Sequence, residues 1–149
     1  AAARESMESQ LLNQSFDTII QSSRLKWKTY FDRIRIMKGG TKQQRKIFYT
    51  FLTRILCMPS DLGIDEENGK WKSGVRHFSE FYCVWDSVRN ANSFITLFAP
   101  ELERDFLNCW LDVAEKTGFF KDAWITGHGA HVQGGCSCDI LYIVQLKHI

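Results

Sequence analysis

The stretch "GVRHFSEFYCVWDSVRNANSFITLFAPELERD", Gly74 to Asp105, decides the fold that we expect for this chain. From Phe78 to Phe98 apolar residues fill most positions, which is typical of a buried helix. Polar residues interrupt them at spacings of four, three and four, which places one polar stripe along that helix: Tyr82, Asp86, Arg89 and Ser93. The pattern alone favours a local ion pair between Asp86 and Arg89 on a solvent-facing side, and the alternative is a site that meets a ligand.

Helical patterns also dominate the rest of the chain. The predicted helices are Ser15 to about Met37, Thr41 to about Met58, Phe78 to Phe98, Pro100 to about Lys116, and a last helix from Ser137 or Asp139. Thr41 with Gln44 matches a capping box, and Pro100 and Gly118 are start and stop signals. The stretch 60–74 reads as a long exposed connection, because it has three glycines and no periodicity. We predict an all-α fold of helical hairpins.

Length and composition indicate one soluble domain. The chain has 149 residues, of which 44% are hydrophobic and 24% charged, enough for one packed core. The formal charge is only +2 and the basic residues are spread from Arg24 to Arg54, so we expect no nucleic-acid partner. No apolar run approaches the roughly 20 residues that cross a bilayer, and we expect no membrane partner. The start "AAARESMESQ" has no signal-peptide order and does not begin with methionine, so localisation stays open and the chain reads as a processed form or a piece of something larger.

Three stretches of the chain resemble one known enzyme family. They are "GGTKQQRKIFYTFLTRILCMPSDLG", "GVRHFSEFYCVWDSVRNANSFITLFAPELERDFLNCWLDVAEKTGFF" and "DAWITGHGAHVQGGCSCDILY". The similarity runs from about Trp27 to Tyr142, and its most specific part is the Trp-Asp-Ser-x-Arg core that begins at Trp85. Together these stretches resemble glycoside hydrolase family 92, whose members are exo-acting α-mannosidases.

The resemblance implies both a fold and an activity. Enzymes of this family join a β-rich domain to an (α/α)6 barrel, whose inner helices surround the substrate cleft. By resemblance, residues 1–149 form a single helical domain that is a fragment of that larger catalytic domain. The implied function is cleavage of terminal α-linked mannose from a mannose-containing glycan by a calcium-dependent, inverting mechanism.

The resemblance also implies substrate-binding residues. A carboxylate and a guanidinium can meet the adjacent hydroxyls of a mannosyl unit, while an indole can cover the apolar face of its ring. We therefore assign Trp85 and Asp86 to the pocket for the terminal sugar, with Arg89 as a further contact or as the residue that orients Asp86. A glycine-rich segment lies at the cleft rim in relatives, and it adds three neighbours of the site: Gln133, Gly134 and Gly135.

No residue of this chain receives a catalytic or metal role. Inverting hydrolysis needs an acid and a base that are usually about 6.5 to 9.5 Å apart. The resemblance places both, together with the calcium ligands, in later parts of the barrel, and we find no matching positions here. We therefore predict that the chain alone is inactive, and that the remainder of the barrel or another chain covers its exposed apolar faces.

A second group of residues suggests different chemistry. His128, His131, Cys136 and Cys138 lie within eleven residues, so a tetrahedral zinc site is conceivable. Their spacing lacks the two separated ligand pairs that zinc sites typically use, and a glycine-rich turn explains the segment better. Cys136 with a nearby histidine could also form a nucleophile, but no orienting third group is identifiable. The five cysteines are an odd number, and we expect buried thiols without a disulfide framework.

A non-enzymatic function is the alternative. A helical module could keep the beginning of the family's fold and serve in interaction or structure. Exposed aromatic side chains would then mark a partner surface. Binding of an α-mannoside, tested with calcium, separates the two hypotheses.

Overall fold

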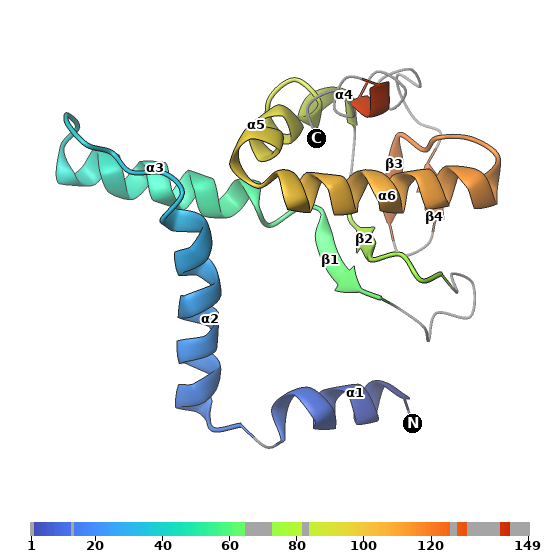
Figure 1. Cartoon of the computed structure of the whole chain (residues 1–149), viewed down its shortest axis with the longest axis horizontal. Coiled ribbons are helices and arrows are strands. Elements are labelled where there is room, and N and C mark those ends of the chain that lie inside the picture. The colour runs from blue at the N-terminus through green and yellow to red at the C-terminus, as the bar shows by residue number, and fades with distance from the viewer. Residues whose placement is uncertain are drawn as a thin grey trace. The chain divides into compact units, whose positions relative to one another are not determined.

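The structure is a computed structural model that describes residues 2–12, 14–64, 73–81, 84–125, 128–130 and 141–143. The chain divides into two compact units, residues 1–45 and residues 46–149. Figure 1 shows the elements of both units with their labels.

The first unit consists of α1 (Ala2–Leu11), α2 (Phe16–Phe31) and the first turn of α3 (Lys42–Ile55). Ser15 caps α2, because its Oγ accepts a hydrogen bond from the backbone N–H of Thr18 at 3.2 Å. The prediction that this helix continues to Met37 is wrong, since it ends at Phe31. The β-branched Ile34 and Ile36, which have lower helix propensity, follow that end.

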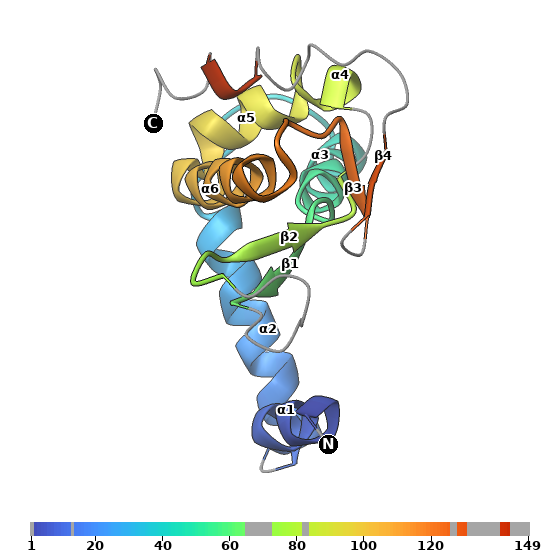
Figure 2. The ribbon, with the colours of Figure 1, turned by 90° about the vertical axis from the view of Figure 1, so that its right-hand side faces the viewer.

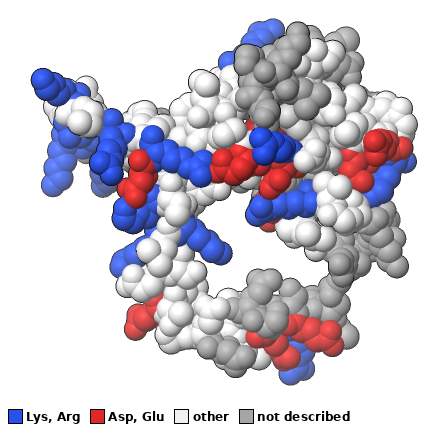
Figure 3. All heavy atoms as spheres, viewed as in Figure 1, with Lys and Arg blue, Asp and Glu red and all other residues white. Residues whose placement is uncertain are grey.

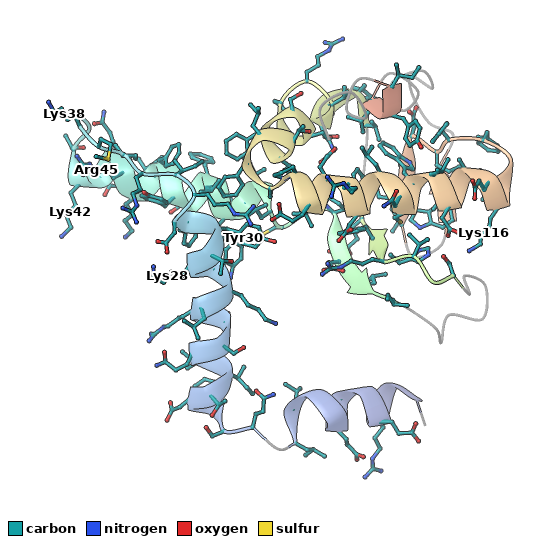
Figure 4. All side chains as sticks on the ribbon, in the orientation of Figure 1. Lys28, Tyr30, Lys38, Lys42, Arg45 and Lys116 are labelled. Carbon is teal, nitrogen blue, oxygen red and sulfur yellow. The ribbon has the colours of Figure 1, made fainter. Side chains whose placement is uncertain are left out.

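The predicted capping box of α3 is confirmed. The backbone N–H of Thr41 donates to the Gln44 side chain at 2.8 Å, and the N–H of Gln44 donates to Thr41 Oγ1 at 3.2 Å. Gly39 precedes the helix with a φ of 82°, and its carbonyl accepts a hydrogen bond from the Arg45 guanidinium at 2.9 Å. Basic side chains project into solvent at this helix start, where Figure 4 labels Lys38 and Lys42.

The second unit contains a small sheet that the sequence did not predict. Strand β1 (Ser60–Gly63) pairs antiparallel with β2 (His77–Ser79). All three residues of β2 are buried, and Glu80 follows with a left-handed φ of 63°. The predicted helix from Phe78 to Phe98 is therefore wrong in its first part, because pairing with β1 and the left-handed turn both exclude helical geometry there.

Three helices occupy the rest of that stretch and the one after it. They are α4 (Val84–Ser87), α5 (Ala91–Phe98) and α6 (Pro100–Thr117). A turn separates α4 from α5, and the Asn90 side chain caps α5 by accepting from the N–H of Ala91. The prediction for α6 is confirmed at both ends. Pro100 lies in its first turn, and Gly118 ends it with a φ of 87°.

A second hairpin follows α6. Strand β3 (Ala123–Ile125) pairs antiparallel with β4 (His128–Ala130), in a stretch for which the sequence predicts no helix or strand (Figure 2). Gly129 passes so close to Lys121 that a Cβ atom there would lie 2.6 Å from the lysine Cδ. The predicted last helix falls mostly outside the described residues, of which 141–143 are helical.

The core of the second unit is aromatic. Helix α6 packs on α5 and β2, and its Phe106 and Trp110 rings contact Phe81 with centroids 5.2 and 5.1 Å away. The described residues thus form a mostly helical fold with two small two-stranded sheets, which confirms the helical part of the prediction and corrects its all-α part. In the described part of the chain, no helix is long and apolar enough to span a bilayer.

Candidate functional site

The predicted Trp-Asp motif lies on α4, a helix of 4 residues. Two backbone hydrogen bonds hold this segment to the chain around β3. The N–H of Val84 donates to the carbonyl of Asp122 at 3.2 Å, and the N–H of Trp124 donates to the carbonyl of Phe81 at 2.9 Å. Val84 itself is 1% exposed and belongs to the core. The position of the motif is therefore set by residues about forty positions further along the chain.

The side chains of the motif differ in exposure. Trp85 is half-buried, whereas Asp86 on α4 and Arg89 in the following turn are exposed. Among the described residues, neither Asp86 nor Arg89 forms a hydrogen bond or an ion pair, so the local pair that the spacing suggested is not formed. Both side chains are exposed and have no such partner among the described residues. Arg89 does not orient Asp86 by direct contact.

The other members of the predicted stripe take different positions. Ser93 lies on α5, half-buried, and its Oγ donates to the Val88 carbonyl at 3.0 Å. The remaining predicted residues fall outside the described ones: Tyr82, Gln133, Gly134 and Gly135. Of the predicted site residues that the structure describes, Trp85 and Asp86 thus lie on α4, and Arg89 lies in the turn that follows it.

A cavity of about 190 Å³ opens beside this motif, and we call it the α5 cavity. Its lining residues come from the end of α3, the segment before α4, and the helices α4 to α6: Arg54, Ile55, Met58, Pro59, Glu80, Phe81, Ser87, Ala91, Asn92, Ile95 and Phe106. Ser87 joins the cavity to the motif, since it directly follows Asp86. Trp85 and Asp86 do not line this cavity.

A larger, more open cavity of about 450 Å³ lies between the β1–β2 connection and α6. Its lining is strongly charged, and Figure 3 shows Asp and Glu side chains next to Lys and Arg along α6. Arg76 donates to Asp61 Oδ1 at 3.0 Å and to Asp105 Oδ2 at 3.1 Å. Asp112 pairs with Lys116 at 2.9 Å. Several wall acids are thus neutralised by basic partners within the protein.

The carboxyl group of Glu103 is buried and contacts Asn92, which is one of the residues that line the α5 cavity. Glu103, in the first turn of α6, is 1% exposed and accepts a hydrogen bond from Asn92 Nδ2 at 3.1 Å. Burial raises the pKa of the Glu103 carboxyl to about 7, while the hydrogen bond from Asn92 lowers it in part. The Oδ1 of Asn92 is also buried, and it accepts no hydrogen bond.

Sequence reasoning missed this buried pair, although one signal was present. Glu103 shares a stripe of α6 with three buried apolar residues at helical spacing: Leu107, Trp110 and Ala114. A charged residue on a buried stripe needs a polar partner from another element. The identity of that partner, Asn92, depends on how α5 folds back on α6.

A buried cysteine lies beside a histidine and an aspartate. Cys109 Sγ is 3.9 Å from His77 Nδ1, and His77 Nε2 is 3.4 Å from Asp112 Oδ2. The order resembles that of a nucleophilic triad, but Cys109 is 0% exposed and burial raises the pKa of its thiol to about 11. A neutral, inaccessible thiol is no nucleophile at neutral pH, so this group has a structural role.

Two of the five cysteines, Cys57 and Cys109, are free thiols in the structure. Cys109 is buried as predicted, whereas the prediction of a buried thiol is wrong for Cys57, which is exposed. The side chains of the zinc hypothesis, His128, His131, Cys136 and Cys138, lie outside the described ones. Within the described ranges, no three carboxylate, histidine or thiol groups are close enough to hold a metal ion.

The comparisons with known proteins bear on the whole chain. Residues 2–146 match the family described as "Glycosyl hydrolase family 92 catalytic domain". No curated protein and no solved structure shows a significant match. The matched range includes α4 with its exposed Asp86 and both cavities. This chain therefore belongs to glycosyl hydrolase family 92.

Proposed function

We propose that this chain is part of a glycoside hydrolase that removes terminal α-linked mannose from a mannose-containing glycan. The family match over residues 2–146 supports the class of enzyme. The observation that carries the role of this segment is the exposed Asp86 carboxylate, which has no partner among the described residues and lies next to Trp85. An exposed acid without a partner beside a half-buried indole fits the recognition of a sugar ring.

The proposed roles follow from the chemistry of the three side chains. The Asp86 carboxylate accepts hydrogen bonds from two adjacent sugar hydroxyls, and the Arg89 guanidinium donates to a hydroxyl oxygen. The Trp85 indole covers the apolar face of the ring. Gln133, Gly134 and Gly135 complete the rim of the proposed pocket.

Hydrolysis itself is assigned to residues other than these. In the proposed inverting reaction, an acid protonates the leaving oxygen and a carboxylate activates water on the opposite side of the ring. Asp86 binds the sugar in this scheme, and no residue of the chain is assigned as acid or base. Calcium belongs to the proposed mechanism of the complete enzyme. Its ligands are assigned to other parts of the catalytic domain, as the resemblance to the family implies.

The proposed complete domain is an (α/α)6 barrel, and exposed apolar side chains support this part of the proposal. On α2, Phe16 is 76% exposed and Leu25 is 64% exposed, while Leu97 on α5 is 87% exposed. Accessible apolar side chains are expected on surfaces that another part of a protein covers, although single ones also occur on ordinary protein surfaces. We assign them to contacts with the remainder of the barrel or with another chain.

Binding of methyl α-mannoside to the purified chain tests the proposed sugar site. Two-dimensional NMR should show shifts for the Trp85 indole and for residues of α4, with a millimolar dissociation constant because only part of the site is present. Asp86→Ala should abolish the shifts. Glu115→Ala, which removes another exposed acid from the same unit, should leave them unchanged.

The same experiment separates the enzyme from the interaction module. Methyl α-glucoside, which differs at one hydroxyl, should bind more weakly than the mannoside. No shift with either sugar would remove the proposed sugar site and favour the non-catalytic module. Calcium-dependent release of mannose by the chain alone would instead require an acid and a base within it.

A further inference from the structure

The connection between α2 and α3 and the start of α3 form a basic end of the first unit. We call residues 35–45 the α3 tip. It contains no acid and four basic residues: Arg35, Lys38, Lys42 and Arg45. All four are exposed, and Figure 3 shows Lys and Arg side chains gathered at the start of α3. The tip therefore carries a local excess of positive charge, although the net charge of the whole chain is only +2.

Three of these cations have no partner within the described part of the chain. Arg35, Lys38 and Lys42 form no hydrogen bond or ion pair with another described residue. Figure 4 shows Lys38 and Lys42 extending away from the ribbon at the same end of α3. Arg45 differs, because its guanidinium donates to the Gly39 carbonyl at 2.9 and 3.2 Å. Arg45 thus holds the turn from which the other three project.

The tip also exposes an apolar side chain among these cations. Met37 is 83% exposed and lies between Arg35 and Lys38 in the sequence. Gly39 and Gly40 follow with left-handed φ values of 82° and 70°, which make the sharp turn into α3. The chain therefore presents one apolar side chain with basic neighbours on both sides of it.

This combination restricts the surface that can cover the tip. Another part of a protein would have to supply an acid for each of Arg35, Lys38 and Lys42, because burial of an unpaired charge costs far more than the burial of Met37 gains. An anionic bilayer meets both requirements. Its phosphate groups pair with Lys and Arg, and the boundary of its acyl chains accepts an apolar side chain.

Nucleic acid fits the tip less well than a bilayer does. Residues 35–45 contain no aromatic side chain that could stack on a base. The aromatic rings on α2 already have partners, since Trp27 stacks on Phe31 with centroids 5.6 Å apart and Arg33 lies 5.1 Å from the centroid of Tyr30. An exposed thioether contributes nothing to the binding of phosphates, whereas it has a place in a bilayer.

We propose that the α3 tip docks on the surface of an anionic lipid bilayer, with Arg35, Lys38 and Lys42 on lipid phosphates and Met37 at the boundary of the acyl chains. A peripheral contact of this kind needs no spanning helix. It departs from the expectation of no membrane partner, which considered spanning segments alone. The inference does not rest on the proposed function.

Co-sedimentation of the whole chain with vesicles tests the role of charge. Vesicles of phosphatidylcholine with phosphatidylglycerol should bind about tenfold more tightly than phosphatidylcholine alone, and the binding should fall as NaCl rises from about 0.05 to 0.5 M. Lys38→Gln with Lys42→Gln should weaken binding about 25-fold, since each cation at the surface contributes about fivefold. Arg24→Gln with Lys26→Gln removes two exposed cations from α2 and should weaken it less than about fivefold.

Methyl NMR of the unchanged protein locates the contact, because the chain has only three methionines. Met7 and Met58 are 49% and 51% exposed, so they are internal controls for Met37. With a spin label on the vesicle lipid, the Met37 methyl signal should lose most of its intensity while the other two keep theirs. Met37→Ser should weaken vesicle binding about tenfold, whereas Met7→Ser should leave it unchanged.

Several results would overturn the proposal. Equal binding to neutral and anionic vesicles, or no binding to either, would remove the bilayer as the partner. Equal losses from the two double variants would show attraction by net charge without a contact at the tip, and so would loss of NMR intensity at Met7 in place of Met37. Binding of a DNA duplex or of polyglutamate without binding to the vesicles would assign the tip to another polyanion.

Discussion

The helices α2 and α6 are of similar length, yet they lie in very different surroundings. Helix α2 has 16 residues, of which none is buried, whereas α6 has 18 residues with a buried stripe that includes Phe106, Trp110 and Val113. Both read as amphipathic in the sequence. The difference teaches that hydrophobic periodicity predicts a helix and its apolar face, but not whether this chain supplies the surface that covers the face.

The largest difference in stability between the two helices is expected when one tryptophan is replaced in each. Trp110 on α6 is 0% exposed, and its Nε1 donates to the Lys121 carbonyl at 3.0 Å. Trp110→Ala should lower the free energy of unfolding of the second unit by about 3 to 5 kcal/mol, because it leaves a large cavity and removes the hydrogen bond to the Lys121 carbonyl. Hydrogen-exchange mass spectrometry measures the loss of protection in α6.

The matched variant is Trp27→Ala on α2. Trp27 is half-buried and stacks on Phe31 with ring centroids 5.6 Å apart. Its removal should change protection in α2 by less than about 1 kcal/mol. A loss as large as that in α6 would mean that α2 is covered in solution, and the contrast between the helices would not hold.

The second-largest difference in stability is expected between the acidic residues in the first turns of the two helices, Glu103 of α6 and Asp17 of α2. Since burial raises the pKa of Glu103 from 4.5 to about 7, the folded protein keeps a proton that the unfolded chain releases. The resulting stabilisation is complete below pH 4.5 and is lost as the pH rises through 7. Glu103→Gln stays neutral, so at pH 8 it should be more stable than the unchanged protein by up to about 3 kcal/mol. Urea denaturation from pH 4 to pH 8 measures this.

Asp17→Asn is the control for this prediction. Asp17 lies exposed in the first turn of α2, and its replacement should cost only a few tenths of a kcal/mol through the helix dipole. A pH dependence that is the same for the unchanged protein and Glu103→Gln would show that Glu103 titrates normally in the folded protein.

The smallest difference in the free energy of unfolding is expected when the lysine–aspartate pair of each helix is broken. The Lys28–Asp32 pair of α2 is largely exposed, with side-chain exposures of 65% and 51%. Asp32→Asn should therefore change the free energy of unfolding by no more than about 0.5 kcal/mol, and less in high salt. Asp112 on α6 is only 14% exposed, so Asp112→Asn should cost about 1 kcal/mol. Equal effects in urea denaturation would show that burial does not separate the two pairs.

Local signals in the sequence predicted much of the helical structure. Pro100 and Gly118 define α6, and Thr41 with Gln44 defines the start of α3. The sheet could not be predicted in this way. Ser60 pairs with Ser79 across a long connection, and both strands are too short for an alternating pattern to stand out.

The candidate site was predictable as a motif but not as an arrangement. The resemblance identified Trp85 and Asp86, whereas the apolar pattern placed them on a long helix that the structure divides into α4 and α5. Asn92 and Glu103 meet only because Pro100 starts a new helix that turns back along α5. Contacts between two helices depend on this turn, and no spacing within one helix reveals them.

The two backbone hydrogen bonds that join Val84 of α4 and the preceding Phe81 to the β3 region also set an order of events during synthesis. A helix of 4 residues has no stability of its own, so α4 can take its position only after Asp122 and Trp124 have left the ribosome. The Trp-Asp motif therefore takes its geometry only as part of the folded second unit. A peptide from Gly74 to Asp105 would contain Trp85, Asp86 and Arg89, but not the geometry that presents them.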